Sequence, residues 1–216
     1  MGTDRFGRDV LLYAIAGLGY SIYFAFAAIV FAAVVGTALG TLWRLQAKTP
    51  VGLLIGEFVT ATLSIPPLII VLAILLVTAG DRLFVSVLVG VIFAPYIARL
   101  IHQDLTKITE ADYFLVERLL GIPYYDSFIR IALPNSLRVA FPTLIALTAD
   151  IVGLDAALSF LGFSLQPVAP GIGQLLRQGL ADVHTAWWIC TGPALLLGSF
   201  VIDLNRYSFQ RTRSLT

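Results

Sequence analysis

Long runs without a charged residue dominate this sequence. No charged side chain occurs between Asp9 and Arg44, and similar apolar runs recur along the rest of the chain. A helix that crosses the hydrocarbon core of a bilayer needs roughly 20 apolar residues at a rise of about 1.5 Å per residue. The runs therefore predict five membrane-spanning helices, near residues 18–42, 51–78, 83–98, 139–161 and 185–202. Strands are not expected, because membrane barrels need alternating segments of about ten residues.

Local features refine the first three predicted spans. Gly17 and Gly19 predict an interfacial turn before the first span, and the Pro-Pro pair at 66–67 predicts a kink in the second. The third span has only 16 uncharged residues between Arg82 and Arg99. It therefore needs these two arginines to extend their charged ends to the membrane surface.

Composition agrees with a membrane protein. Of the 216 residues, 58% are hydrophobic and 12% are charged, and that charged fraction is about half the value for a soluble domain. The net charge of +1 contains no clustered basic excess of the kind that binds nucleic acid. The single cysteine excludes an internal disulfide, and the two separate histidines do not make a usual zinc site. We expect an all-α polytopic protein with one membrane domain over residues 1–216 and no cofactor.

The basic residues are distributed unequally between the two sides of such a bundle. The connections at 43–50 and 99–138 and the C-terminal tail hold ten of the 14 Lys and Arg residues, and the other side holds the remaining four. Cytoplasmic segments carry the excess of Lys and Arg in membrane proteins. We therefore expect an external N-terminus, a cytoplasmic C-terminus and a cytoplasmic connection at 99–138.

The connection between the third and fourth spans contains signals for two short helices. Thr109, with an acidic residue three positions later, has the spacing of a capping box. A helix is therefore predicted over 110–120, and Gly121 supplies its stop. Pro123 then opens a second helix, which we expect to end before the Leu-Pro pair at 133–134.

Four motifs occur in order along the chain and carry a resemblance. They are G-T-D-R-F-G-R-D-V at 2–10, Gly121 followed after nine residues by I-A-L-P-N at 131–135, D-A-A-L-S-F-L-G at 155–162, and a spaced Gln-Pro, Pro, Gly, Leu and Gly series at 166–179. The second resembles the latter half of the EAA loop of bacterial ABC importer permeases. Together the four resemble the permease subunits of oligopeptide, dipeptide and nickel importers.

The chain also departs from that family's pattern. In place of Glu-Ala-Ala it has Leu115, Val116 and Glu117, Ile172 stands where a Trp is usual, and Ser164 where a Gly is usual. These permeases usually have one more spanning helix before the Gly-Thr-Asp motif. A natural five-helix subunit and a truncated start are both open explanations, and the distribution of basic residues favours five spans for the chain as given.

The resemblance implies a transport subunit and not an enzyme. The sequence has no G-x-x-x-x-G-K-[ST] phosphate loop, so ATP binding is expected in a separate ATPase subunit. The other implied partners are a second permease subunit, in a heterodimer, and an extracytoplasmic solute-binding protein. The implied location is the bacterial cytoplasmic (inner) membrane, and the implied solutes are short peptides, or nickel or another metal as a chelate.

The resemblance further implies that the helix at 110–120 couples the permease to its ATPase, within a cytoplasmic loop at about 102–135. Three of its residues form an apolar stripe at i, i+3 and i+7, which suits a helix that docks in a groove. The candidate coupling residues are Tyr113, Val116, Glu117, Arg118, Leu120 and Gly121. The alternative is that the stripe rests on the protein's own helices or on the membrane surface.

Asp150 and Asp155 are the candidates for lining a translocation path, because ionisable residues inside a membrane are costly and mark functional sites. Five residues apart on one helix, they point about 140° apart and do not form the facing pair of an intramembrane protease. For Asp155 a structural hydrogen bond is an equal alternative. The alternative function is a gradient-driven secondary transporter or channel that uses both aspartates as ion sites.

Two glycines on the first span bear on its packing. Gly36 and Gly40 form a small-xxx-small pair, which allows another helix to approach closely. That helix could belong to the same chain or to a second permease subunit. Glu57, at the start of the second span, is interpreted as interfacial.

Overall fold

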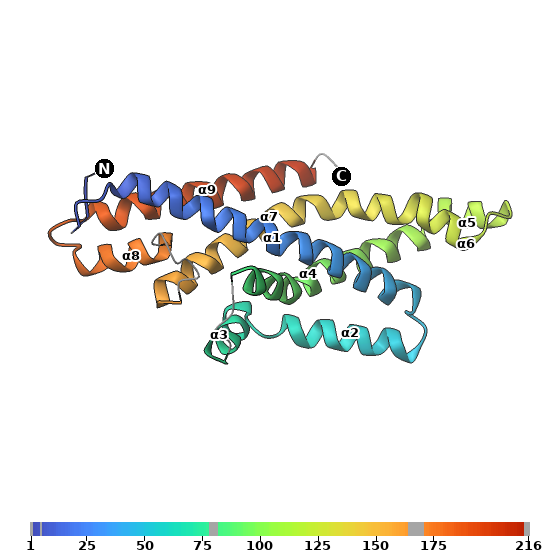
Figure 1. Ribbon diagram of the computed structural model, residues 1–216. Coiled ribbons are helices and arrows are strands. Elements are labelled where there is room, and N and C mark those ends of the chain that lie inside the picture. Colours follow the sequence, from blue (N-terminus) through green and yellow to red (C-terminus); the bar gives the residue numbers. More distant parts are fainter. Residues whose placement is uncertain (1, 5, 78–81, 164–170, 214–216) are drawn as a thin grey trace.

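The computed structural model describes residues 2–4, 6–77, 82–163 and 171–213, and these form a helical bundle (Figure 1). The described part contains no strand beyond one isolated bridge between Thr3 and Asp9. The helices in chain order are α1 (Val10–Leu45), α2 (Pro50–Leu63), α3 (Pro67–Val77), α4 (Arg82–Glu110), α5 (Asp112–Leu119), α6 (Tyr124–Ser127), the π-helical turn η1 (Phe128–Ala132), α7 (Leu133–Leu161), α8 (Ile172–Ala181) and α9 (Trp188–Arg213). The all-α fold class is confirmed.

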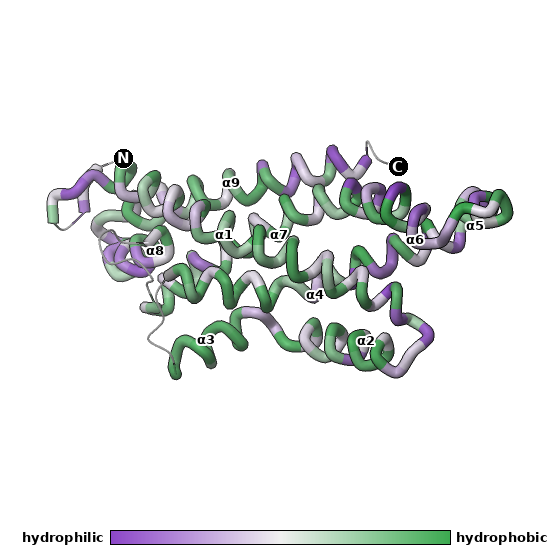
Figure 2. Tube along the Cα trace, turned by 45° about the vertical axis from the view of Figure 1, so that its right-hand side comes forward, coloured by the Kyte–Doolittle hydropathy of each residue, from purple (hydrophilic) through white to green (hydrophobic). Residues whose placement is uncertain are grey.

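Four helical segments of the described chain are long and apolar enough to cross a membrane: Val10–Leu45, Leu83–Glu110, Tyr124–Leu161 and Trp188–Arg213. The helices α2 and α3 together make a fifth if the bent pair counts as one span. Hydrophobic residues fill the length of the bundle and hydrophilic residues gather toward its two ends (Figure 2). The structure thus has four spans, and it reaches the predicted five when the bent pair is counted as one broken span.

The first helix begins earlier than the sequence indicated. The carboxylate of Asp9 accepts hydrogen bonds from the backbone N–H groups of Leu11 and Leu12, at 2.8 and 3.2 Å, and so caps α1. The helix then continues without a break through Gly17 and Gly19. The predicted interfacial turn is absent, because a capped apolar helix tolerates glycine at a cost of only about 1 kcal/mol per residue.

Close packing of α1 against α4 forms the centre of the bundle. A methyl group at Gly36 or Gly40 would lie 2.6 or 2.5 Å from the carbonyl oxygens of Ala94 or Ala98, so the two backbones touch there. Gly90 of α4 makes the reciprocal approach to the backbone of α1. The glycine pair on α1 thus serves packing within the chain, which was one of the two alternatives that the sequence left open.

The second span breaks instead of kinking. Neither Pro66 nor Pro67 has an N–H to donate, so α2 ends at Leu63 and α3 starts afresh at Pro67 with its axis turned by 86°. The hydrogen bond from the N–H of Ile69 to the carbonyl of Pro66, at 3.0 Å, closes the first turn of α3. Two consecutive prolines remove two helical bonds in a row, which explains why the bend is so sharp.

The third and fourth spans are longer than predicted. Instead of ending near residue 98, α4 continues to Glu110. The helix expected to stop before the Leu-Pro pair at 133–134 instead continues through η1 into α7, giving one helical segment over Tyr124–Leu161. That expected stop is wrong. Pro134 lies in the first turn of α7, where its missing N–H costs little, and the wider π turn before it keeps the chain helical.

The connections divide between two ends of the bundle. The α1–α2 turn, the C-terminal end of α4, α5 and α6 lie at one end, and the N-terminus and α8 lie toward the other (Figure 1). We refer to the first as the α5 end. Its position puts the segments richest in Lys and Arg on the same side of the spanning helices.

Packing of α1 on α4 predicts opposite responses at two glycines of one helix. Gly40→Ala places a methyl group against the Ala98 carbonyl and should lower the free energy of unfolding by about 1–3 kcal/mol. Gly19→Ala meets no atom within 4 Å and should raise it by up to about 1 kcal/mol through helix propensity. Thermal unfolding of the two purified variants in detergent measures the difference. Equal effects would show that α1 and α4 do not touch at Gly40.

Candidate functional site

The short helix α5 follows directly on α4 and is held by one buried aromatic residue. Phe114 is 1% exposed, and its ring meets that of Tyr124 edge to face with the centroids 5.7 Å apart. Asp112 lies in the first turn of α5, where its negative charge interacts favourably with the positive end of the helix dipole. The predicted helix at 110–120 is thus present, two residues shorter at its start and one at its end, with Phe114 as its attachment to the bundle.

The opposite side of α5 is an exposed apolar surface. Tyr113, Val116 and Leu120, the predicted stripe, are 50%, 51% and 75% exposed. Leu119, which the sequence reasoning did not include, is 79% exposed and extends the same surface. We call these four residues the α5 face. Its exposure argues against the alternative that the stripe is covered by the protein's own helices.

A left-handed glycine ends α5 and directs the chain onward. Gly121 has φ +85°, and the N–H of Ile122 donates to the carbonyl of Glu117 at 3.2 Å, which is the six-to-one bond of a Schellman motif. No atom lies within 4 Å of the position a Cβ would take, so the need for glycine is conformational alone. Glu117 is half-buried, while the side chains of Leu115 and Arg118 lie outside the described part of the chain.

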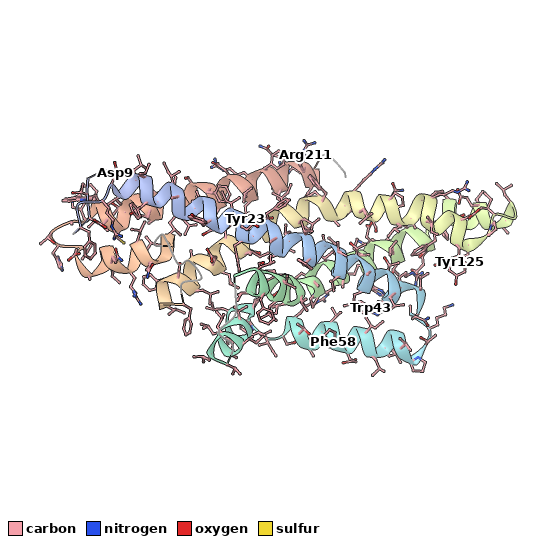
Figure 3. The ribbon with its side chains drawn as sticks, in the orientation of Figure 1. Asp9, Tyr23, Trp43, Phe58, Tyr125 and Arg211 are labelled. Atoms are coloured by element: carbon pink, nitrogen blue, oxygen red, sulfur yellow. The ribbon has the colours of Figure 1, made fainter. Side chains whose placement is uncertain are left out.

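A polar contact links the end of α1 to the end of α4, directly before α5. Arg44 donates from Nε and Nη2 to the hydroxyl oxygen of Thr109, at 3.0 and 2.6 Å, and its Nη2 lies 3.5 Å from Oε1 of Glu110. Trp43, labelled in Figure 3, precedes Arg44 on α1, and its ring stacks on that of His102 in α4 with the centroids 3.9 Å apart. Glu110 is exposed, so the hydrogen bonds to Thr109 carry most of this contact.

Thr109 does not have the capping role that its spacing predicts. It was expected to cap the helix at 110–120, but α4 runs through it and its hydroxyl donates to the carbonyl of Leu105 at 2.6 Å. The spacing of a capping box is short and also occurs inside helices, where a Thr hydroxyl bonds back to the preceding turn. Arg44 is the first charged residue after the long apolar run that follows Asp9, and that was the available signal for its anchoring role.

The two intramembrane aspartates have different surroundings. Asp155 is 4% exposed, and its Oδ2 accepts a hydrogen bond from the hydroxyl of Ser21 at 2.5 Å. That bond joins α7 to α1 in the interior of the bundle. The surroundings of Asp155 therefore fit the alternative of a structural hydrogen bond.

Asp150 instead lies exposed at a groove. The groove has a volume of about 390 Å³ and is lined from three helices that contact one another, α3, α4 and α7. Its lining residues are Pro66, Pro67, Leu68, Phe93, Tyr96, Asp150, Gly153, Leu154 and Ala157. We call it the Asp150 groove. The break between α2 and α3 shapes it, because Pro66 and Pro67 form one of its walls.

The N-terminal motif folds into a closed loop at the end of the bundle opposite α5. Oδ1 of Asp4 accepts from the N–H groups of Phe6 and Arg8, both at 2.9 Å, and Oδ2 pairs with the Arg8 guanidinium at 2.6 Å. Burial alone would raise the pKa of the Asp4 carboxyl, but these hydrogen bonds outweigh it and lower that pKa. The indole N–H of Trp188 donates to the Thr3 carbonyl at 3.2 Å and attaches the loop to α9.

Other motif residues have packing roles or lie outside the described residues. A Cβ at Gly173 would overlap the Ala156 carbonyl of α7, and one at Gly179 would overlap the backbone of Cys190 in α9. Any side chain at either glycine would therefore separate α8 from the bundle. The motif positions from Ser164 to Pro170 are not among the described residues.

Glu57 is exposed on α2. In the described part of the chain, no three His, Cys, Asp or Glu residues come together as a metal site would require.

Comparison with known proteins gives the following matches. The sequence pattern of the family described as "Binding-protein-dependent transport system inner membrane component" matches residues 36–214. The di/tripeptide transport system permease protein DppC of Pseudomonas aeruginosa is 27% identical over 208 residues, which is 95% of this chain and 67% of that protein. The dipeptide transport system permease protein DppC of Haemophilus influenzae is 24% identical over 95% of this chain and 69% of that protein.

Solved structures share the fold. Two inward-facing crystal forms of the MetNI methionine ABC transporter contain a chain that matches with TM-scores of 0.70 and 0.72. The sequence identities are 20% and 19%, and each match covers 95% of this chain and 97% of the other. At this level of identity the likeness establishes the arrangement of the helices and nothing further.

The contrast between the two aspartates predicts different effects on stability. Asp155→Ala removes a buried interhelical hydrogen bond and should lower the free energy of unfolding by about 1–3 kcal/mol. Asp150→Ala, at an exposed position, should change it by no more than about 0.5 kcal/mol. Unfolding of the purified variants in detergent provides the measurement, and Asp155→Asn, which keeps an acceptor oxygen, should recover most of the loss. A larger loss for Asp150→Ala would reverse the two assignments.

Proposed function

The chain belongs to the family of binding-protein-dependent transport system inner membrane components, and we propose that it is the permease subunit of an importer of short peptides. The match over residues 36–214 carries this proposal, since it includes both the α5 face and the Asp150 groove. It confirms the resemblance to ABC importer permeases that the motifs indicated. The alternative of a gradient-driven transporter or channel is not favoured by this family.

The family assigns transport and ATP hydrolysis to separate subunits. The chain is a transport subunit of the inner membrane and not an enzyme, and the ATPase is a separate subunit. Energy must therefore reach the spanning helices through a contact between proteins. A coupling surface on this chain has to be exposed, firmly attached to the spanning helices and located at one end of the bundle.

In our proposal the α5 face is that surface, within a coupling loop at about 102–135 of a single permease domain. Its exposed apolar side chains suit a helix that docks in a groove, and the sequence adds two charged residues there, Glu117 and Arg118. Phe114, the Gly121 turn and the Arg44–Thr109 contact support a rigid attachment, so movement of α5 would be passed to α4 and α1. The alternative occupant of this face is the membrane surface.

The proposed solute is a short peptide because the similar proteins in Pseudomonas aeruginosa and Haemophilus influenzae are named as peptide permeases. Nickel or another metal remains the second candidate solute and would have to travel as a chelate, since the described residues hold no cluster of metal ligands. The remaining proposed partners are a second permease subunit in a heterodimer and an extracytoplasmic solute-binding protein.

We propose that the α5 end faces the cytoplasm, with an external N-terminus and a cytoplasmic C-terminus. Ten of the 14 basic residues belong to segments of that side, as the positive-inside rule requires. Asp150 then lines the translocation path. A carboxylate exposed on a spanning helix is too costly to face lipid and needs a water-filled space or a partner subunit. Asp155, the other sequence candidate for the path, would stabilise the α1–α7 contact instead.

Uptake by the intact transporter tests the proposed function. This chain should co-purify with an ATPase, and uptake of labelled di- or tripeptide by cells that carry the system should fall to the background level when ATP is depleted while the proton gradient is kept. Collapsing the gradient with ATP present should leave uptake largely intact. Uptake that follows the gradient, or a chain that purifies without an ATPase, would contradict the proposal.

A charged side chain on the α5 face tests the coupling role. Val116→Glu introduces a charge at an exposed apolar position, so the chain should fold normally while ATPase association and uptake fall at least about tenfold, the equivalent of 1.4 kcal/mol of lost contact. The control is Lys48→Glu, an exposed position in the α1–α2 turn at the same end of the bundle, which should retain both. Co-purification and uptake are measured in parallel. Normal ATPase association and uptake in Val116→Glu would contradict the coupling role and favour contact of α5 with the membrane surface.

A further inference from the structure

The lining of the Asp150 groove has an uneven chemistry. Asp150 contributes a carboxyl group, and the other lining residues are apolar apart from the hydroxyl of Tyr96. Phe93, which is 4% exposed, and Tyr96 line the groove from α4, and their rings are stacked with centroids 5.6 Å apart, while Asp150 lines it from α7. A negative charge and an aromatic pair therefore share one cavity inside the membrane-spanning part of the protein.

This combination suits an organic ammonium group. A carboxylate attracts a cation by charge, and aromatic faces attract a weakly hydrated cation through their quadrupole while they also pack against its carbon atoms. A bare metal ion needs several oxygen, nitrogen or sulfur ligands, and one carboxylate on an apolar wall does not supply them. The volume of about 390 Å³ lies in the range of small-ligand sites.

The other intramembrane carboxylate provides an internal comparison. Asp155 is buried and engaged by the hydroxyl of Ser21, so it offers no open position to a solute. Asp150 lies five residues earlier on the same helix and is exposed to the groove. The same side chain thus has a packing role at one position and is available for recognition at the other.

We infer that the Asp150 groove is a subsite for the ammonium group of the transported solute, with Asp150 as the counter-ion and Phe93 and Tyr96 as the aromatic wall. The inference rests on the proposed function as a peptide permease and specifies what this part of the path recognises. Two sources share the chemistry: the N-terminal ammonium of a peptide and the ammonium of a lysine side chain. One carboxylate without further fixed donors holds such a group weakly, as a path requires if solutes are to leave again.

The single cysteine of this chain makes a direct test possible. In the complete transporter complex, Cys190→Ala removes that thiol and Ala157→Cys places a new one on the groove wall. Labelling of this chain by a trimethylammonium-ethyl methanethiosulfonate is compared with labelling by the anionic sulfonatoethyl reagent. The ratio of cationic to anionic rates should fall about tenfold on Asp150→Asn and recover with Asp150→Glu. Glu57→Gln, which removes an exposed carboxylate on α2, is the matched control and should leave the ratio unchanged.

Protection by peptides then identifies the group that binds. Without the solute-binding protein, trialanine at millimolar concentration should slow labelling of Ala157→Cys severalfold, and N-acetyltrialanine should not. Protection by N-acetyl-lysine amide as well would add the side-chain ammonium as a second ligand. An unchanged rate ratio in Asp150→Asn, or equal protection by trialanine and its acetylated form, would overturn the inference. The labelling ratio and the protection by peptides are both measured without ATP. Either can therefore fail while the proposed ATP-driven function stands.

Discussion

Backbone contact between α1 and α4 is the interaction on which the rest of the bundle depends. Lipid is as apolar as the side chains of spanning helices, so helices associate in a membrane through close van der Waals packing and not through the hydrophobic effect. Gly36, Gly40 and Gly90 allow this packing, since each would carry a methyl group into the opposite backbone. The other helices apart from α6 each contact α1 or α4, and α5 is attached where α4 ends.

Two polar contacts join helices of the bundle. Ser21 satisfies the buried carboxylate of Asp155, and Arg44 binds the hydroxyl of Thr109 at the end of the bundle. Asp150 lies on a spanning helix where the break between α2 and α3 opens a groove. Unpaired polar groups are costly in lipid, so a carboxylate at this groove needs water or a partner protein.

The connection between the third and fourth spans shows where reasoning from local sequence succeeds and fails. The helix α5 and its glycine stop were predictable, because a positive φ at Gly121 and an apolar stripe are local properties. The capping role expected of Thr109 and the stop expected at 133–134 were wrong. Both signals depend on whether the neighbouring helix has already ended, and packing of α4 and α7 in the bundle prolongs each helix past its local signal.

The sequence alone determined the class of the protein, the number of apolar spans and the resemblance to importer permeases. These follow from run lengths and motif spacing, which bilayer thickness and backbone chemistry translate directly into helices. Only the tertiary structure decided that Gly36 and Gly40 pack against α4, that Asp155 pairs with Ser21 and that Asp150 lies at a groove. A linear pattern gives the angle between residues on one helix, but it does not say which other helix each face contacts. That neighbouring helix decides whether a carboxylate is structural or available to a solute.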